Sequence, residues 1–224
     1  MPGRTFGALP YDMAHLLGGA ALLLSFVLLY QRRTLTLIHT YALQAWVLAA
    51  TAAWQGWVQG EADLYITAVI GLAAKGIIIP VALSRIAHKL AVPRGVETAL
   101  GVFPSMMLGV GLVVLALMVV LPTTPFSQAL TREDLASALS VVLLGLLMMI
   151  TRRNAFSQVI GFLSLENGTS LAAVGMRGMP LVIEMSIAIL VLIGFIVLGV
   201  FVFRIRERFD SLDIHHLDDT GLHR

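Results

Sequence analysis

The chain has 224 residues, of which 58% are hydrophobic and only 12% are charged, and its mean hydropathy is +0.90. A soluble globular domain carries about 25% charged residues, so this composition excludes a water-soluble globule. It also excludes intrinsic disorder, which requires low hydrophobicity and high charge. The sequence has no cysteine, which rules out disulfides, thiolate metal sites and cysteine-ligated iron–sulfur clusters. We therefore expect no cofactor to be bound by this chain itself.

Several stretches with few or no charges are candidates for helices that cross a bilayer core about 30 Å thick. In chain order the seven candidates are Met13–Gln31, Thr34–Gly60, Leu64–Ser84, Thr98–Leu121, Leu135–Thr151, Asn154–Met176 and Pro180–Phe203. No small-residue cleavage site follows the first stretch, which favours a retained span over a signal peptide. The sequence therefore predicts an all-α integral membrane protein with seven transmembrane helices.

The basic residues outside these spans are divided unequally between the two sides of the membrane. The N-terminal side holds three: Arg4, Arg132 and Arg177. The other side holds eleven: Arg32, Arg33, Arg85, Lys89, Arg94, Arg152, Arg153, Arg204, Arg206, Arg208 and Arg224. Because cytoplasmic loops carry the excess of Lys and Arg, we expect an outside N-terminus and a cytoplasmic C-terminus.

A weak internal repeat divides the chain. Arg32-Arg33 after the first span and Arg152-Arg153 after the fifth lie 120 residues apart, and each pair precedes a long span, a short outer loop and a third span. Two parallel three-helix units joined by a linker helix would give this pattern, although basic residues after alternate helices are common in any membrane protein. The expected divisions are residues 1–90 for the first unit, 91–130 for the linker helix, 131–204 for the second unit and 205–224 for a cytoplasmic tail.

Three charged residues, Lys75, Glu166 and Glu184, fall inside spans. Each costs roughly 2.5–3.5 kcal/mol at the centre of a membrane helix, so each should face protein or water. Glu166 is central in its span, where an unpaired carboxylate is too costly to stay ionised. It should therefore be protonated or paired with a cation, and Lys75 is the only cation that this chain places within a span. A proton-handling role and a helix-joining role both remain open for Glu166, and Glu184 is either a relay group or an interfacial carboxylate.

The surroundings of Lys75 indicate irregular helix geometry. Gly76 follows it, and Pro80 lacks the N–H that would bond the Gly76 carbonyl. This combination predicts a broken or kinked helix lining a polar cavity, and an ion pair between Lys75 and Glu166 is compatible with it. His39, near the start of the second span, completes the candidate proton-relay residues, although an interfacial histidine is the simpler interpretation.

Other kinds of site are not indicated by the sequence. There is no Walker loop, no dinucleotide fingerprint and no histidine pair spaced for haem ligation within a span. The basic clusters flank helices, so no nucleic-acid partner is expected. His215, His216 and His223 in the tail are expected to be solvated rather than to bind a metal.

The motifs around Glu166 resemble those of a known family. Arg152-Arg153-Asn154, Gln158–Phe162 and Glu166-Asn167-Gly168 are similar to elements of the membrane subunit called component E of hydrogenase-4. The stretch Lys75–Pro80 and the closing Ser211–Ile214 extend this resemblance over nearly the whole chain.

The C-terminal half also resembles the small K-type subunit of respiratory complex I. That family has three helices, an arginine-rich first cytoplasmic loop and two membrane glutamates, which Glu166 and Glu184 match in position and order. The resemblance implies a place in the polar axis of proton translocation. The N-terminal half departs from it, because the repeat offset puts Trp46 opposite Glu166 and the third span has Lys75 but no carboxylate.

The resemblance implies a non-catalytic subunit of a complex I-like, energy-converting [NiFe]-hydrogenase or formate hydrogenlyase-type complex in a prokaryotic plasma membrane. The [NiFe] centre and the iron–sulfur clusters would lie on other subunits. Expected partners are antiporter-like and quinone- or anchor-type membrane subunits, peripheral hydrogenase or dehydrogenase subunits, and the lipid bilayer. The alternative is a related respiratory or cation-antiporter complex with another electron donor. An independent retinal protein is disfavoured, because the seventh span has no lysine.

Overall fold

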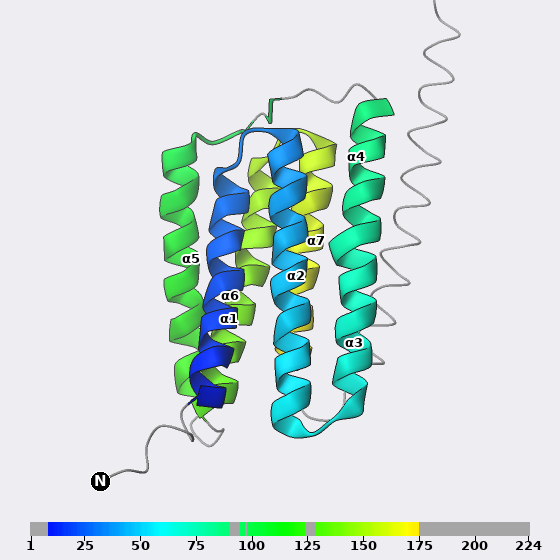
Figure 1. Cartoon of the computed structure of the whole chain (residues 1–224). Coiled ribbons are helices and arrows are strands. Elements are labelled where there is room, and N and C mark those ends of the chain that lie inside the picture. The colour runs from blue at the N-terminus through cyan, green and yellow to red at the C-terminus, as the bar shows by residue number, and fades with distance from the viewer. Residues whose placement is uncertain (1–8, 90–94, 97, 124–128, 175–224) are drawn as a thin grey trace, which may run out of the picture. The chain divides into compact units, whose positions relative to one another are not determined.

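The computed structural model describes residues 9–89, 95–96, 98–123 and 129–174 (Figure 1), all of which lie in the compact unit Met1–Glu184. Regular structure within these ranges is helical, apart from two isolated β-bridges. The elements are α1 (Leu9–Tyr30), α2 (Thr34–Gln59), α3 (Ala62–Ala73), the π-helical turn η1 (Ala74–Ile78), α4 (Ile79–Lys89), α5 (Val102–Thr123), α6 (Ala129–Thr151) and α7 (Ala155–Val174).

The helices follow the predicted spans closely in the described part of the chain. Four stretches are long and apolar enough to cross a membrane by length and composition: Met13–Tyr30, Thr34–Gln59, Ala62–Lys89 and Val102–Pro122. A shorter apolar helix covers Leu135–Thr151, and α7 occupies the sixth predicted span. The all-helical membrane class is thereby supported. The seventh span, Pro180–Phe203, lies outside the described residues, so the count of seven stays a prediction.

The turns that carry the two arginine pairs lie at the same end of the helices. The Val96 N–H donates to the Arg32 carbonyl at 2.8 Å, and the Ala99 N–H donates to the Thr151 carbonyl at 2.7 Å. The bridges Arg33–Gly95 and Thr98–Arg152 extend both contacts. The segment before α5 therefore joins the α1–α2 turn to the α6–α7 turn. Helix α5, which corresponds to the fourth predicted span, begins at Val102 rather than at the predicted Thr98.

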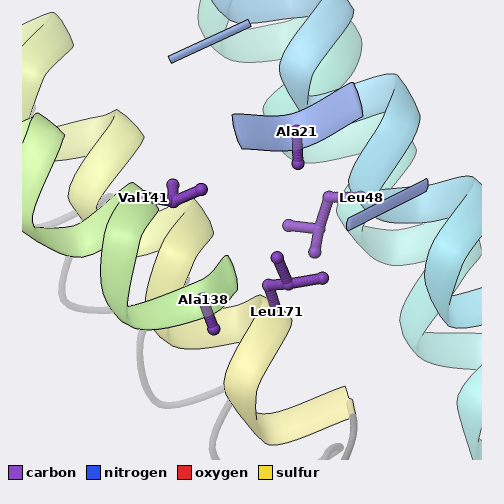
Figure 2. Close-up of a cluster of buried hydrophobic side chains, with 5 residues drawn as sticks. All are labelled: Ala21, Leu48, Ala138, Val141 and Leu171. Atoms are coloured by element: carbon purple, nitrogen blue, oxygen red, sulfur yellow. The ribbon is translucent and has the colours of Figure 1, made fainter. Parts of the chain in front are cut away.

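Small and branched side chains from four helices form the core between the two halves of the sequence. Figure 2 shows this cluster, in which Ala21 of α1, Leu48 of α2, Ala138 and Val141 of α6, and Leu171 of α7 face one another and are buried. Helix α1 packs on α2 and α6, and α2 packs on α7. Corresponding helices of the proposed repeat are thus in contact, α1 with α6 and α2 with α7.

Helices α6 and α7 approach each other so closely that their backbones touch. A Cβ atom on Gly145 would lie 2.6 Å from the backbone nitrogen of Leu165, and one on Gly168 would lie 2.8 Å from the backbone nitrogen of Val142. No side chain fits at those distances. This packing of small residues is typical of helix association inside membranes, and it fixes the position of Glu166 relative to α6.

The outward faces are strongly apolar. Large hydrophobic side chains of α5 are highly exposed, including Phe103 at 73% and Met118 at 68%. A soluble monomer rarely exposes a contiguous apolar surface of this kind. Together with the apolar spans, it supports a membrane environment for the described helices.

Candidate functional site: a buried lysine–glutamate pair

Lys75 of η1 and Glu166 of α7 form an ion pair in the interior. The Lys75 Nζ lies 2.7 Å from Glu166 Oε1, and the two side chains are only 3% and 4% exposed. Lys75 Nζ also donates to Ser170 Oγ at 2.8 Å, and Ser170 Oγ donates to Glu166 Oε1 at 3.2 Å. The three side chains form a closed triangle, so both charges are compensated and hydrogen-bonded, as burial of an ion pair requires.

A π-helical turn, rather than a break, places Lys75 in this interior position. The residues Ala74–Ile78 form the turn, whose end is bonded from the Ile79 N–H to the Ala74 carbonyl, and α4 continues directly from it. A π turn contains one more residue than an α-helical turn and is frequent at functional sites. The predicted broken or kinked helix is therefore a π turn in a continuous helix.

The carbonyl that Pro80 leaves without its usual helical partner has a side-chain donor. The indole N–H of Trp46 on α2 donates to the Gly76 carbonyl at 3.1 Å. The absent side chain at Gly76 makes this approach possible, because a Cβ there would lie 2.9 Å from Trp46 Cδ1 and Nε1. Trp46, which the predicted repeat aligns with Glu166, thus supports the residue next to Lys75.

A second polar branch begins beside Glu166 and runs towards α1. Asn167 Nδ2 donates to Gln44 Oε1 at 3.2 Å, and Gln44 Nε2 donates to Ser25 Oγ at 2.8 Å. Ser25 Oγ in turn donates to the Ala21 carbonyl at 3.0 Å. This series of hydrogen bonds ends on a backbone carbonyl, so it joins α7, α2 and α1 and, among the described residues, leads to no titratable side chain.

Three buried polar atoms around the pair keep hydrogen-bonding capacity. Within the described ranges, Glu166 Oε2, Asn167 Oδ1 and the Tyr41 hydroxyl have no hydrogen-bond partner. Buried polar groups of this kind usually bond to internal water. Glu166 Oε2, the carboxylate oxygen that does not contact Lys75, therefore keeps capacity for a further hydrogen bond.

The Arg152-Arg153-Asn154 motif has a different local role at each residue. Arg152 is buried, and its Nη2 donates to the Leu28 carbonyl at 3.0 Å and to the Leu29 carbonyl at 2.7 Å. It thereby caps the last turn of α1, the negative end of the helix dipole. Burial, and to a smaller extent the neighbouring Arg32, lower the pKa of Arg152, although a guanidinium stays protonated in proteins.

The other two motif residues stand at the start of α7. The Asn154 Oδ1 accepts a hydrogen bond from the Phe156 N–H at 2.9 Å, which caps the helix. Arg153 is exposed. The motif as a whole therefore fixes the junction between α1, α6 and α7 rather than contributing directly to the Lys75–Glu166 pair.

Among the described residues, the predicted relay residue His39 is not joined to this pair. His39 is exposed and lies on an apolar groove of about 460 Å³, which Trp46, Gly76, Pro80 and Ser84 also line. Lys75 does not line this groove; the ion pair with Glu166 is observed, and a polar cavity beside Lys75 stays a prediction. Glu184 lies outside the described residues. No group of three His, Asp or Glu in the described part of the chain could hold a metal ion.

Sequence reasoning did not single out Ser170, Gln44 or Ser25. Ser170 lies four residues after Glu166 and so must share its helix face, which is a usable signal. Gln44 is a large polar residue in an apolar stretch, and such residues commonly join helices within membranes. The link from Gln44 to Ser25 depends on how α1 and α2 pack, and no local pattern encodes it.

The fold and this site define an all-helical membrane protein with a buried lysine–glutamate pair. No family model matches the sequence, and no solved structure matches it. The chain is 29% identical over 182 residues to hydrogenase-4 component E of Escherichia coli K12, covering 79% of this chain and 82% of that protein. Hydrogenase-4 component E of Shigella flexneri matches with the same identity and coverage.

An uncharacterized protein of Mycobacterium tuberculosis is 28% identical over 201 residues, which cover 89% of this chain and 91% of that protein. These distant similarities extend over most of both chains. They support the resemblance to component E of hydrogenase-4, whereas the resemblance to K-type subunits stays a prediction.

Proposed function

We propose that this chain is a non-catalytic membrane subunit of a complex I-like, energy-converting [NiFe]-hydrogenase or formate hydrogenlyase-type complex. In it, the chain contributes to proton or ion translocation and to assembly of the membrane arm. The observation that carries the proposal is a buried Lys75–Glu166 pair in a chain similar to hydrogenase-4 component E. The [NiFe] and iron–sulfur centres belong to peripheral partner subunits, and antiporter-like and quinone- or anchor-type subunits are its membrane neighbours.

The pair has the chemistry of a charge-balanced proton relay. A proton that reaches Glu166 Oε2 makes the carboxyl neutral and removes the negative charge that lies 2.7 Å from the Lys75 ammonium. Loss of a neighbouring negative charge makes a buried ammonium less favourable, so protonation of Glu166 favours the release of a proton from Lys75. One proton enters at the carboxyl, one leaves from the amine, and the site remains electrically balanced before and after. Ser170, hydrogen-bonded to both groups, holds the amine next to the carboxyl.

The arginine pairs give the proposed orientation. Both turns lie at one end of the helices, and we assign this end to the cytoplasm of a prokaryotic plasma membrane because of its excess of Lys and Arg. Peripheral subunits that carry the redox centres would meet the membrane arm on that side.

Co-purification tests membership of the complex. A tagged chain extracted in mild detergent should bring down hydrogenase or formate-oxidising subunits together with antiporter-like membrane subunits, as identified by mass spectrometry. If the chain co-purifies instead with subunits that use another electron donor, the related respiratory or antiporter complex replaces the hydrogenase assignment. A well-folded monomer, together with an intact and active complex after deletion of the chain, contradicts the proposal.

Substitution of Glu166 tests the relay role. Glu166→Gln keeps size and hydrogen bonding but does not titrate, so hydrogen or formate chemistry with an artificial acceptor should persist while proton translocation per turnover falls. Glu166→Asp keeps a titrating group and should retain part of the coupling. Glu61→Gln alters an exposed carboxylate and serves as the matched control. A Glu166→Gln complex with normal coupling and normal assembly rules out the relay role.

A further inference from the structure

The contact between Trp46 and Gly76 lies immediately beside the ion pair. Trp46 Nε1 donates to the Gly76 carbonyl at 3.1 Å, and Gly76 is the neighbour of Lys75 within η1. Pro80 provides no N–H for that carbonyl. The hydrogen bond from α2 therefore replaces a backbone bond of the η1–α4 junction with a side-chain donor from another helix.

The geometry of η1 decides the direction in which Lys75 points. An α-helix has 3.6 residues per turn, so the extra residue of a π turn changes the helix register by about 100°. Returning η1 to regular α geometry would rotate Lys75 relative to α3 or relative to α4. Either change would move the amine away from Glu166 Oε1, which is now 2.7 Å from it.

Trp46 contributes little by burial. Its side chain is 53% exposed, and it stands on the apolar groove of α2 and α4, where the outer part of the ring would face lipid. In a membrane such a ring gains little by being covered, because lipid is as apolar as the protein interior. The specific contribution of Trp46 is thus the N–H that it presents to Gly76.

We propose that Trp46 and Gly76 are positioning residues that hold η1 in its π-helical form and thereby keep Lys75 against Glu166. Trp46 acts through its indole N–H, and Gly76 acts by leaving the space that the indole occupies. The consequence for transport rests on the proposed relay function, whereas the position of Lys75 can be measured without it. The predicted repeat would place a carboxylate at position 46, where the chain has the indole of Trp46. Through Lys75, this indole helps to position the carboxylate of Glu166.

Carbodiimide labelling of Glu166 measures the pairing directly. A hydrophobic carbodiimide adds to protonated carboxylic acids in apolar surroundings, so a carboxylate held ionised by Lys75 is protected. The assay uses the full chain in its native membrane assembly, with labelling at Glu166 quantified by mass spectrometry per assembled chain. Lys75→Gln removes the protecting cation, so its labelling rate sets the upper end of the scale.

Trp46→Phe keeps an aromatic ring but removes the N–H, and it should raise labelling of Glu166 severalfold, towards the rate of Lys75→Gln. Trp57→Phe, at a 63% exposed tryptophan of the same helix, is the matched control and should leave labelling unchanged. A Trp46→Phe rate equal to that of the unmodified protein overturns the proposal. Equal labelling of Lys75→Gln and the unmodified protein also overturns it, because Lys75 would then not protect the carboxylate.

The double variant Trp46→Phe/Pro80→Ala separates positioning from simple support of a carbonyl. The alanine gives the Gly76 carbonyl a backbone N–H and lets the turn relax to α geometry, so labelling of Glu166 should stay as high as in Trp46→Phe. Recovery of full protection would mean that Trp46 only satisfies the carbonyl, and it would overturn the proposal. Loss of coupling in Glu166→Gln with unchanged labelling in Trp46→Phe refutes the positioning role alone. Normal coupling in Glu166→Gln with raised labelling in Trp46→Phe refutes the relay alone.

Discussion

Lys75 and Glu166 meet at 2.7 Å across the interface of η1 and α7, with almost no exposure of either side chain. The two residues come from different halves of the sequence, so their contact exists only when η1 packs against α7. A buried pair of this kind contributes little net stability compared with apolar residues, but removal of one partner leaves an uncompensated charge. The pair therefore links correct packing of the two halves to charge balance at the site.

The destabilisation caused by single substitutions at this pair should not add up in the double variant. Lys75→Gln should destabilise the chain by about 3–5 kcal/mol, because Glu166 would be buried without a cation. Lys75→Met combined with Glu166→Leu should be far less destabilising, since neither charge remains. The fraction of assembled chain that survives heating in mild detergent measures both effects. A double variant less stable than Lys75→Gln would contradict this account of the pair.

The helices were predictable because their signals are local. Apolar runs and arginine pairs gave α1, α2 and the continuous segment Ala62–Lys89 within a few residues, and Gly60 ends α2 with a left-handed φ of 72°, as a C-terminal glycine does. The start of α5 was predicted too early because Thr98 and Ala99 contact the α6–α7 turn. That contact is tertiary, and hydropathy does not encode it.

Only the two charged residues of the site were predictable from the sequence. Burial cost alone identified Lys75 and Glu166, and Pro80 identified the unsatisfied Gly76 carbonyl. The sequence left open whether Lys75 pairs with Glu166, because the distance between two helices depends on packing such as the contact of α6 with α7. The donor that Gly76 receives from Trp46 likewise requires the arrangement of α2 against η1.

Arg152 should be far more sensitive to substitution than Arg153. Arg152→Lys keeps the charge but cannot reproduce the planar guanidinium that bonds both the Leu28 and Leu29 carbonyls. Loss of such charge-assisted hydrogen bonds should cost about 1.5–3 kcal/mol, measured as a lower midpoint of thermal disassembly. Arg153→Lys, at an exposed position, should stay within about 0.5 kcal/mol. Equal effects at the two positions would remove the structural role assigned to Arg152.

The orientation in the membrane can be read by cysteine labelling, because the chain has no cysteine of its own. Glu61→Cys and Arg153→Cys each place one thiol at an exposed position, at opposite ends of the helices. In intact cells a membrane-impermeant maleimide should label Glu61→Cys only, and permeabilised cells should show labelling of both. Labelling of Arg153→Cys alone in intact cells would invert the proposed topology.

Close packing of α6 on α7 should make Gly145 intolerant of even a methyl group. A Cβ at Gly145 would lie 2.6 Å from Leu165 N and 2.9 Å from the Gly161 carbonyl, so the two backbones must separate. Overpacking in a tight interior typically costs about 1–3 kcal/mol, and here the displaced helix carries Glu166. Gly145→Ala should therefore lower the yield of assembled chain and raise carbodiimide labelling of Glu166 as the pair with Lys75 loosens.

Gly111→Ala provides the matched control, because a Cβ there would meet no neighbouring side chain or helix of the described residues within 4 Å. The new methyl group on α5 meets open space, and alanine has a higher helix propensity than glycine. Its assembly and labelling should thus equal or exceed those of the unmodified protein. If Gly145→Ala also matched the unmodified protein in both measurements, the backbone contact of α6 with α7 would not be what fixes Glu166 in place.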